Sequence, residues 1–132
     1  MKKMLAYKVF IERNERIYSF CKHVFDNLNK NYVEYSKTSW NDRKFPIKNS
    51  GPFCAFDNLD AVHNFLLCFA KYNIIYSVYQ IEAVPSLKDF VWENYNNGIY
   101  TKITNIHNLA SQTLLVERFK IIKLIYQTTG WE

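Results

Sequence analysis

The chain has 132 residues, a formal net charge of +5, 48% apolar residues and 17% aromatic residues. This length fits a single domain spanning residues 1–132, and the apolar content excludes an intrinsically disordered chain. The three glycines and three prolines exclude collagen-like and low-complexity sequence. The charge suits an anionic partner, but it falls short of the dense basic stripe of duplex-binding domains, so nucleic acid is not an expected partner.

Cysteine usage and hydropathy favour a cytoplasmic protein with no membrane partner. Cys21, Cys54 and Cys68 form no C-x-x-C pair, and their surroundings predict reduced thiols in the core. The N-terminus lacks the apolar segment of a signal peptide. The longest apolar stretch, 65–70, is too short to span a bilayer.

The first third of the chain predicts three strands. Segments 6–12 and 16–22 alternate and are rich in β-branched and aromatic residues. Asn14 lies between them and tolerates the left-handed conformation, so we expect a β-hairpin. In the first strand one face carries Tyr7, Val9 and Ile11, and the other carries Lys8, Phe10 and Glu12. A third, exposed strand is expected at 32–37, followed by a long polar loop at 38–50.

The middle of the chain predicts a short apolar strand at 53–56 and one principal helix at about 58–71. Asp57 is the expected cap, and Asn73 is available at the other end. Apolar residues recur at helical spacing, namely Leu59, Val62, Leu66 and Phe69.

The last part of the chain contains the clearest strand pattern, at 74–84, which Pro85 ends. We expect a long loop at 86–113, with a short strand at 99–103 as the alternative for part of it. Segment 116–126 fits both a strand and a helix, and its β-branched content favours a strand. Residues 127–132 are expected to form a frayed tail.

Together these elements predict an α+β fold. The sheet is expected to be twisted, mostly antiparallel and made of five to seven strands, with the one principal helix packed on one face.

Catalytic and metal-binding patterns are missing from the sequence. His23, His63 and His107 have no ligand at metal spacing, and the isolated glycines form no phosphate loop. No serine nucleophile motif or carboxylate pair is visible. We therefore expect no catalytic residues, metal or cofactor, and a non-catalytic protein is favoured over an enzyme.

Arginine and aromatic residues are the candidate ligand-binding residues. An aromatic side chain stacks on a base, and a guanidinium forms two parallel hydrogen bonds with a phosphate. On this basis the candidate site residues are Arg16, Trp40, Arg43, Trp92, Tyr95 and Arg118. The alternative is that these aromatic residues belong to the core or the sheet surface, since the chain has ten Tyr and ten Phe.

Four segments together resemble a group of small uncharacterised proteins from phages and prophages. Their pattern is Tyr-Lys-x-Phe, then Gly-x-Phe, then Val-x-x-Ile-Glu-Ala, then Lys-Ile-Ile-Lys, and it falls here at 7–10, 51–59, 78–83 and 118–125. The resemblance implies an α+β phage accessory protein, active in the host cytoplasm, without implying an activity.

A short strand, a helix and a long strand in this order also resemble small ADP-ribosyltransferase folds. That resemblance implies an NAD cleft beside an Arg or His, an aromatic residue and a Glu. The residues available for these roles are Arg16 or His23, Tyr18, and Glu82 or Glu117.

Three functional hypotheses follow. The first is a non-catalytic anti-defence sponge that sequesters a phosphorylated nucleotide signal, of the cyclic nucleotide or cyclic ADP-ribose type. The second is a protein-interaction module, whose partner is a second copy of the chain or an inhibited host protein. The third is an ADP-ribosyltransferase-like enzyme that uses NAD.

Overall fold

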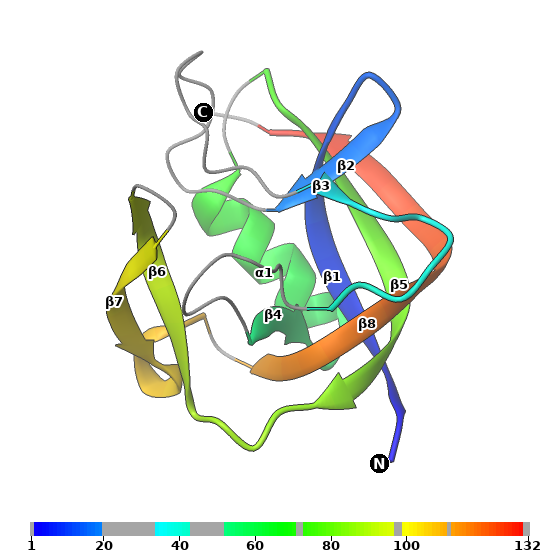
Figure 1. Cartoon of the computed structure of the whole chain (residues 1–132). Helices are drawn as coiled ribbons and strands as arrows, with labels where there is room; N and C mark the ends of the chain where they lie inside the picture. Colours follow the sequence, from blue (N-terminus) through cyan, green and yellow to red (C-terminus); the bar gives the residue numbers. More distant parts are fainter. Residues whose placement is uncertain are drawn as a thin grey trace.

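The structure is a computed structural model that describes residues 2–19, 34–42, 52–70, 73–96, 99–110 and 112–130. For residues 19, 92–96 and 99–103 it describes the backbone alone. Figure 1 shows the elements, which are in chain order β1 (Met4–Arg13), β2 (Arg16–Ser19), β3 (Glu34–Tyr35), β4 (Phe53–Phe56), α1 (Leu59–Phe69), β5 (Ile75–Pro85), β6 (Phe90–Asn96), β7 (Ile99–Asn105), the 3-10 turn η1 (Ile106–Asn108) and β8 (Thr113–Thr129).

The main sheet has six strands in the order β3-β2-β1-β4-β8-β5, and β1 also pairs with β5. Every pairing is antiparallel. The extra pairing closes β1, β4, β8 and β5 into a ring. Only Tyr7 and Phe56 join β1 to β4, so this seam of the ring is short. Three register shifts between β5 and β8 accompany the long curve of β8 in Figure 1, since bulges bend a strand.

The β1–β2 hairpin forms as the sequence predicts. Asn14 and Glu15 have φ angles of 53° and 65°. Two successive left-handed residues are what a tight hairpin turn needs to match the twist of its strands. The alternation of β1 is also confirmed, because Val9 and Ile11 belong to one buried cluster and Phe10 to another.

Two apolar clusters lie on opposite faces of the sheet. The first lies inside the ring and includes Phe10, Tyr35, Phe53 and Phe119. The second lies between the sheet and α1, where Val62 and Leu66 of the helix pack with strand residues such as Val78. We call the first the ring core and the second the helix core. The helix therefore covers one face of the sheet, and the side chains of the other face fill the interior of the ring.

Helix α1 is shorter than predicted, and Asn58, not Asp57, is its cap. The Asn58 side chain accepts a hydrogen bond of 2.9 Å from the backbone N–H of Ala61. At the other end the C-cap is Ala70, not Asn73. Asn73 lies three residues further on and has a left-handed φ angle of 66°. Leu67 and Phe69 are exposed on the helix, so its apolar stripe is wider than the face it buries.

Two predicted irregular segments are largely regular. The region 86–113 contains the two-stranded sheet of β6 and β7, and Figure 1 shows this hairpin well away from β1, β5 and β8. Residues 127–129 belong to β8 rather than to a frayed tail, and Gly130 donates a backbone hydrogen bond of 2.9 Å to Ile74. The Thr residues at the end of β8 suit a strand because β-branched side chains fit a pleated surface.

The α+β class, the mostly antiparallel sheet and the single principal helix are confirmed for the described residues. The prediction of three core thiols is wrong for Cys68, which is exposed on α1, while Cys54 is half-buried and Cys21 lies outside the described residues. In the described part of the chain, no helix is long and apolar enough to cross a membrane.

Candidate ligand-binding site

A short segment at 36–42 connects the end of β3 to β8, and we call it the strap. Its anchor is Asn41, whose backbone exchanges two hydrogen bonds with Phe119, of 2.7 and 3.1 Å. The Asn41 side chain accepts from the Ser36 N–H at 2.8 Å and donates to the Ser36 carbonyl at 3.0 Å. The strap is thus folded on itself and attached to β8 through one residue. Part of the loop predicted at 38–50 is therefore ordered by this bridge.

Replacing Asn41 with alanine is expected to lower the free energy of unfolding by about 1–3 kcal/mol, because partly buried backbone groups of the strap lose the hydrogen bonds of this buried side chain. Asn41 is only 8% exposed. Urea denaturation followed by circular dichroism measures the change. Asn108→Ala is the matched control, since Asn108 is exposed at the end of η1, and its effect is expected to stay within about 0.5 kcal/mol. Equal losses in both variants would contradict the anchoring role of Asn41.

The strap places Trp40 beside a cationic side chain of β8. The guanidinium carbon of Arg118 lies 4.7 Å from the centre of the Trp40 ring, and Lys3 Nζ lies 5.1 Å from it. A stacked guanidinium on an indole is a favourable cation–π contact. We call the group formed by Lys3, Trp40, Asp42, Glu82 and Arg118 the Trp40 cluster.

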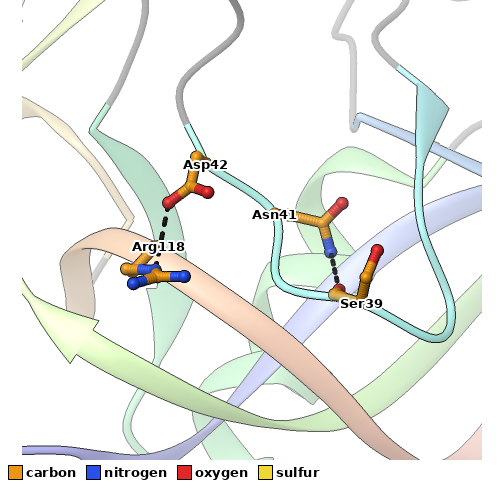
Figure 2. Close-up of polar contacts among 4 residues, drawn as sticks. All are labelled: Ser39, Asn41, Asp42 and Arg118. Carbon is orange, nitrogen blue, oxygen red and sulfur yellow. Dashed lines mark hydrogen bonds and ion pairs between the residues drawn. The ribbon is translucent and has the colours of Figure 1, made fainter.

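Two carboxylates hold the cations of the Trp40 cluster. Arg118 Nε lies 3.0 Å from Asp42 Oδ1, and Figure 2 shows this ion pair next to the folded strap. Nε is shielded from solvent and makes no aligned hydrogen bond, while the Arg118 side chain as a whole is 43% exposed. Lys3 Nζ lies 3.9 Å from Glu82, with both side chains partly exposed. The cluster therefore combines a flat aromatic ring with two cations and two anions.

The other predicted site residues do not join this cluster within the described structure. Arg16 opposes Arg13 at the far end of β1 and lies 3.6 Å from Glu34. Lys3 directly precedes β1 and Arg13 is its last residue, so ten residue steps of extended chain, roughly 30 Å, separate the two. Arg43 lies outside the described residues. Trp92 and Tyr95 lie on β6, and their side chains are not among those described.

The residues considered for an ADP-ribosyltransferase role are also dispersed. Arg16, on β2, opposes Arg13 at one end of β1, whereas Glu82 opposes Leu5 near the other end. Glu117 lies on β8 and accepts a short hydrogen bond from the Ser86 hydroxyl. His23 lies outside the described residues. The described residues thus bring no Arg, aromatic residue and Glu of that set together.

Lys8, which is not among the predicted site residues, lies inside the ring core. It is 6% exposed, and its Nζ donates a hydrogen bond of 2.7 Å to the Cys54 carbonyl. Nζ also lies 5.5–5.8 Å from the ring centres of Phe10, Phe119 and Tyr35. The available signal was the alternation of β1, which puts Lys8 on the same face as Phe10.

Burial lowers the pKa of Lys8 from 10.5 to about 8, because desolvation disfavours the ammonium, and the neighbouring Cys54 opposes part of this effect. At pH 7 the amine is still mostly protonated. Lys8 therefore places a positive charge among aromatic rings, where an uncompensated ion is costly.

A second polar group lies elsewhere on the ring. Glu12 of β1 accepts a hydrogen bond of 2.6 Å from the buried Ser77 hydroxyl and a short one from the Gln127 amide. Gln127 also donates to Ser77 at 3.1 Å. Each polar side chain has a partner here, and the three residues tie β1, β5 and β8 together, so the group has a structural role.

Among the described residues, no group of three or more His, Cys, Asp or Glu side chains is placed to hold a metal ion. In the comparisons with known proteins, no family model, no curated protein and no solved structure matches this chain.

Proposed function

We propose that this protein is a non-catalytic binding protein that holds a phosphorylated nucleotide at the Trp40 cluster. The observation that carries the proposal is the stacking of Arg118 on Trp40 at 4.7 Å, with Lys3 near the same ring. Aromatic rings stack on bases, and guanidinium groups form paired hydrogen bonds with phosphate oxygens. A binder needs no turnover, so a preorganised ring and cation suffice.

The internal ion pairs determine how such a ligand would bind. Asp42 contacts Arg118 through Nε, and this leaves the terminal guanidinium nitrogens for phosphate. Two cations and two carboxylates cancel in charge, so the ligand phosphate competes with Asp42 and Glu82 for their partners. We therefore expect binding to weaken as the salt concentration rises, because these charges are partly exposed and screened.

Calorimetric titration with a panel of linear and cyclic nucleotides tests the proposal. Arg118→Lys keeps the charge but removes the planar fork, and Trp40→Leu removes the stacking surface. Each is expected to weaken binding about tenfold or more. Arg16→Lys is the matched control, since Arg16 also lies in a partly exposed ion pair but on β2, beside the far end of β1. The assignment would be overturned if none of the nucleotides binds, or if Arg16→Lys weakens binding as much as Arg118→Lys and Trp40→Leu do.

The phage-type sequence pattern supplies the proposed setting. A protein of this kind, present in the host cytoplasm, would sequester a cyclic nucleotide or cyclic ADP-ribose signal and so blunt a host defence. Cellular levels of free signal, measured with and without the protein, would separate sequestration from no effect. Association with a second copy of the chain or with a host protein stays a prediction.

A further inference from the structure

The ring core contains a charged donor whose hydrogen-bonding capacity is mostly unused. A lysine ammonium has three N–H donors. Lys8 is only 6% exposed. Among the described residues, its Nζ donates one hydrogen bond, to the Cys54 carbonyl. None of the described carboxylates pairs with it. Two donors of this buried cation therefore have no hydrogen-bond acceptor among the described residues.

The surroundings of Lys8 are flat and apolar. Phe10, Tyr35 and Phe119 place their ring centres within 5.8 Å of Nζ. These rings contact one another edge to face or tilted, at 5.2–5.8 Å between centres. Cation–π contacts offset part of the cost of the charge but supply no acceptor for its remaining protons.

Two of the contacts around the ring core are made by a single residue pair each. The β1–β4 seam consists of one residue pair, Tyr7 with Phe56. The strap is joined to β8 by the isolated bridge between Asn41 and Phe119. Seams closed by one pair of residues open locally at lower free energy than full strand pairings. Local opening of the β1–β4 seam, where Tyr7 precedes Lys8 in the chain, would give a small molecule access to the Lys8 amine.

We propose that Lys8 is the anchor of an interior site for a small organic monocarboxylate with a flat apolar body. The carboxylate would accept the two unused Lys8 N–H donors, and the apolar body would pack against Phe10, Tyr35 or Phe119. One negative charge matches one buried ammonium. A phosphate dianion would bring a second charge into the core without a partner, and a buried unpaired charge is costly. This site shares no residue with the Trp40 cluster.

Benzoate is the probe, and benzamide, its uncharged isostere, is the ligand control. At pH 7 benzoate is expected to raise the thermal unfolding midpoint, whereas benzamide at the same concentration is not. The Lys8→Met variant keeps the length of the side chain without the charge, and its affinity for benzoate is expected to fall by about tenfold to a hundredfold. Lys88→Met is the matched control, since Lys88 lies 5.9 Å from the Phe90 ring but is exposed; it should leave binding unchanged.

A second readout follows the amine itself. Bound benzoate favours the ammonium, so the NMR titration midpoint of the Lys8 side chain is expected to rise when benzoate is added. The other titratable groups on the strands around Lys8 are Cys54, Tyr35 and Tyr79, and their signals are followed in the same titration so that the change at Lys8 is assigned to its own amine. Equal stabilisation by benzoate and benzamide, equal benzoate binding in Lys8→Met, or an unmoved Lys8 titration would each overturn the proposal.

Discussion

Phe119→Ala is expected to lower the free energy of unfolding by about 3–5 kcal/mol, the range for removing a buried aromatic side chain. Phe119 is fully buried at 0% exposure. Its ring centre lies 5.1 Å from that of Phe53, 5.2 Å from that of Tyr35 and 5.8 Å from that of Phe10. Truncation would leave a cavity bounded by rigid rings that cannot close around it. Urea denaturation followed by circular dichroism measures the loss.

Phe69→Ala provides the matched control for this experiment. Phe69 is 37% exposed at the end of α1 and has Phe65 as its ring neighbour, 5.1 Å away. Because less apolar area leaves the interior, the expected loss is below about 1.5 kcal/mol. Phe119→Leu, which keeps most of the volume, is expected to recover more than half of the loss of Phe119→Ala. Similar losses for Phe119→Ala and Phe69→Ala would contradict the central place of Phe119 in the ring core.

Strands with local signals were predictable from the sequence. The β1–β2 hairpin was predictable because Asn14 supplies the left-handed turn and both flanking segments alternate. The long strand β5 was predictable for the same reason, and Pro85 is its last residue. The β-branched residues of β8 correctly favoured a strand, although the strand extends to Thr129. In each case the chain's own period determines the conformation.

Of the β6–β7 hairpin only the alternative strand at 99–103 was predicted, and β7 (Ile99–Asn105) confirms it, whereas β6 was missed because its signals are weaker than those of β5. The sequence Asn96-Asn97-Gly98 is typical of a tight turn, but Glu93 and Asn94 interrupt the apolar alternation of 90–96. The two strands form a separate sheet, so their pairing with each other replaces pairing with the main sheet. Propensity alone does not reveal such a pairing, since strand stability depends on cross-strand neighbours.

The candidate sites depend on contacts between residues that are distant in sequence. Trp40 and Arg118 were both singled out, but nothing local indicates that the Asn41–Phe119 bridge would bring them together. The helix cap shows the same limit on a smaller scale, since Asp57 and Asn58 both have capping side chains and the sequence does not choose between them. Lys8 was missed because lysine is almost never fully buried without a partner. Its burial depends on residues of β3, β4 and β8, namely Tyr35, Cys54 and Phe119, which are distant from Lys8 in the sequence.

The free energy of unfolding is expected to depend on pH through Lys8. Its folded-state pKa of about 8 is below the ordinary value of 10.5, so between these pH values the unfolded chain binds more protons than the folded chain. Stability from this group therefore rises as the pH increases from about 8 to 10.5, and the full penalty is present below about 8. The difference between the folded and unfolded pKa values corresponds to about 3 kcal/mol.

Lys8→Met removes this penalty of about 3 kcal/mol. It also removes the hydrogen bond to the Cys54 carbonyl, which costs about 1 kcal/mol, so the variant is expected to be more stable at pH 7 by about 2 kcal/mol. Urea denaturation of both proteins from pH 6 to 10.5 measures the effect. The advantage of the variant should shrink steadily above pH 8 and vanish or reverse near pH 10.5. Tyr126, whose pKa burial raises, titrates in both proteins and cancels in the difference. A difference that stays constant across this range would show that the Lys8 ammonium is compensated in the folded protein.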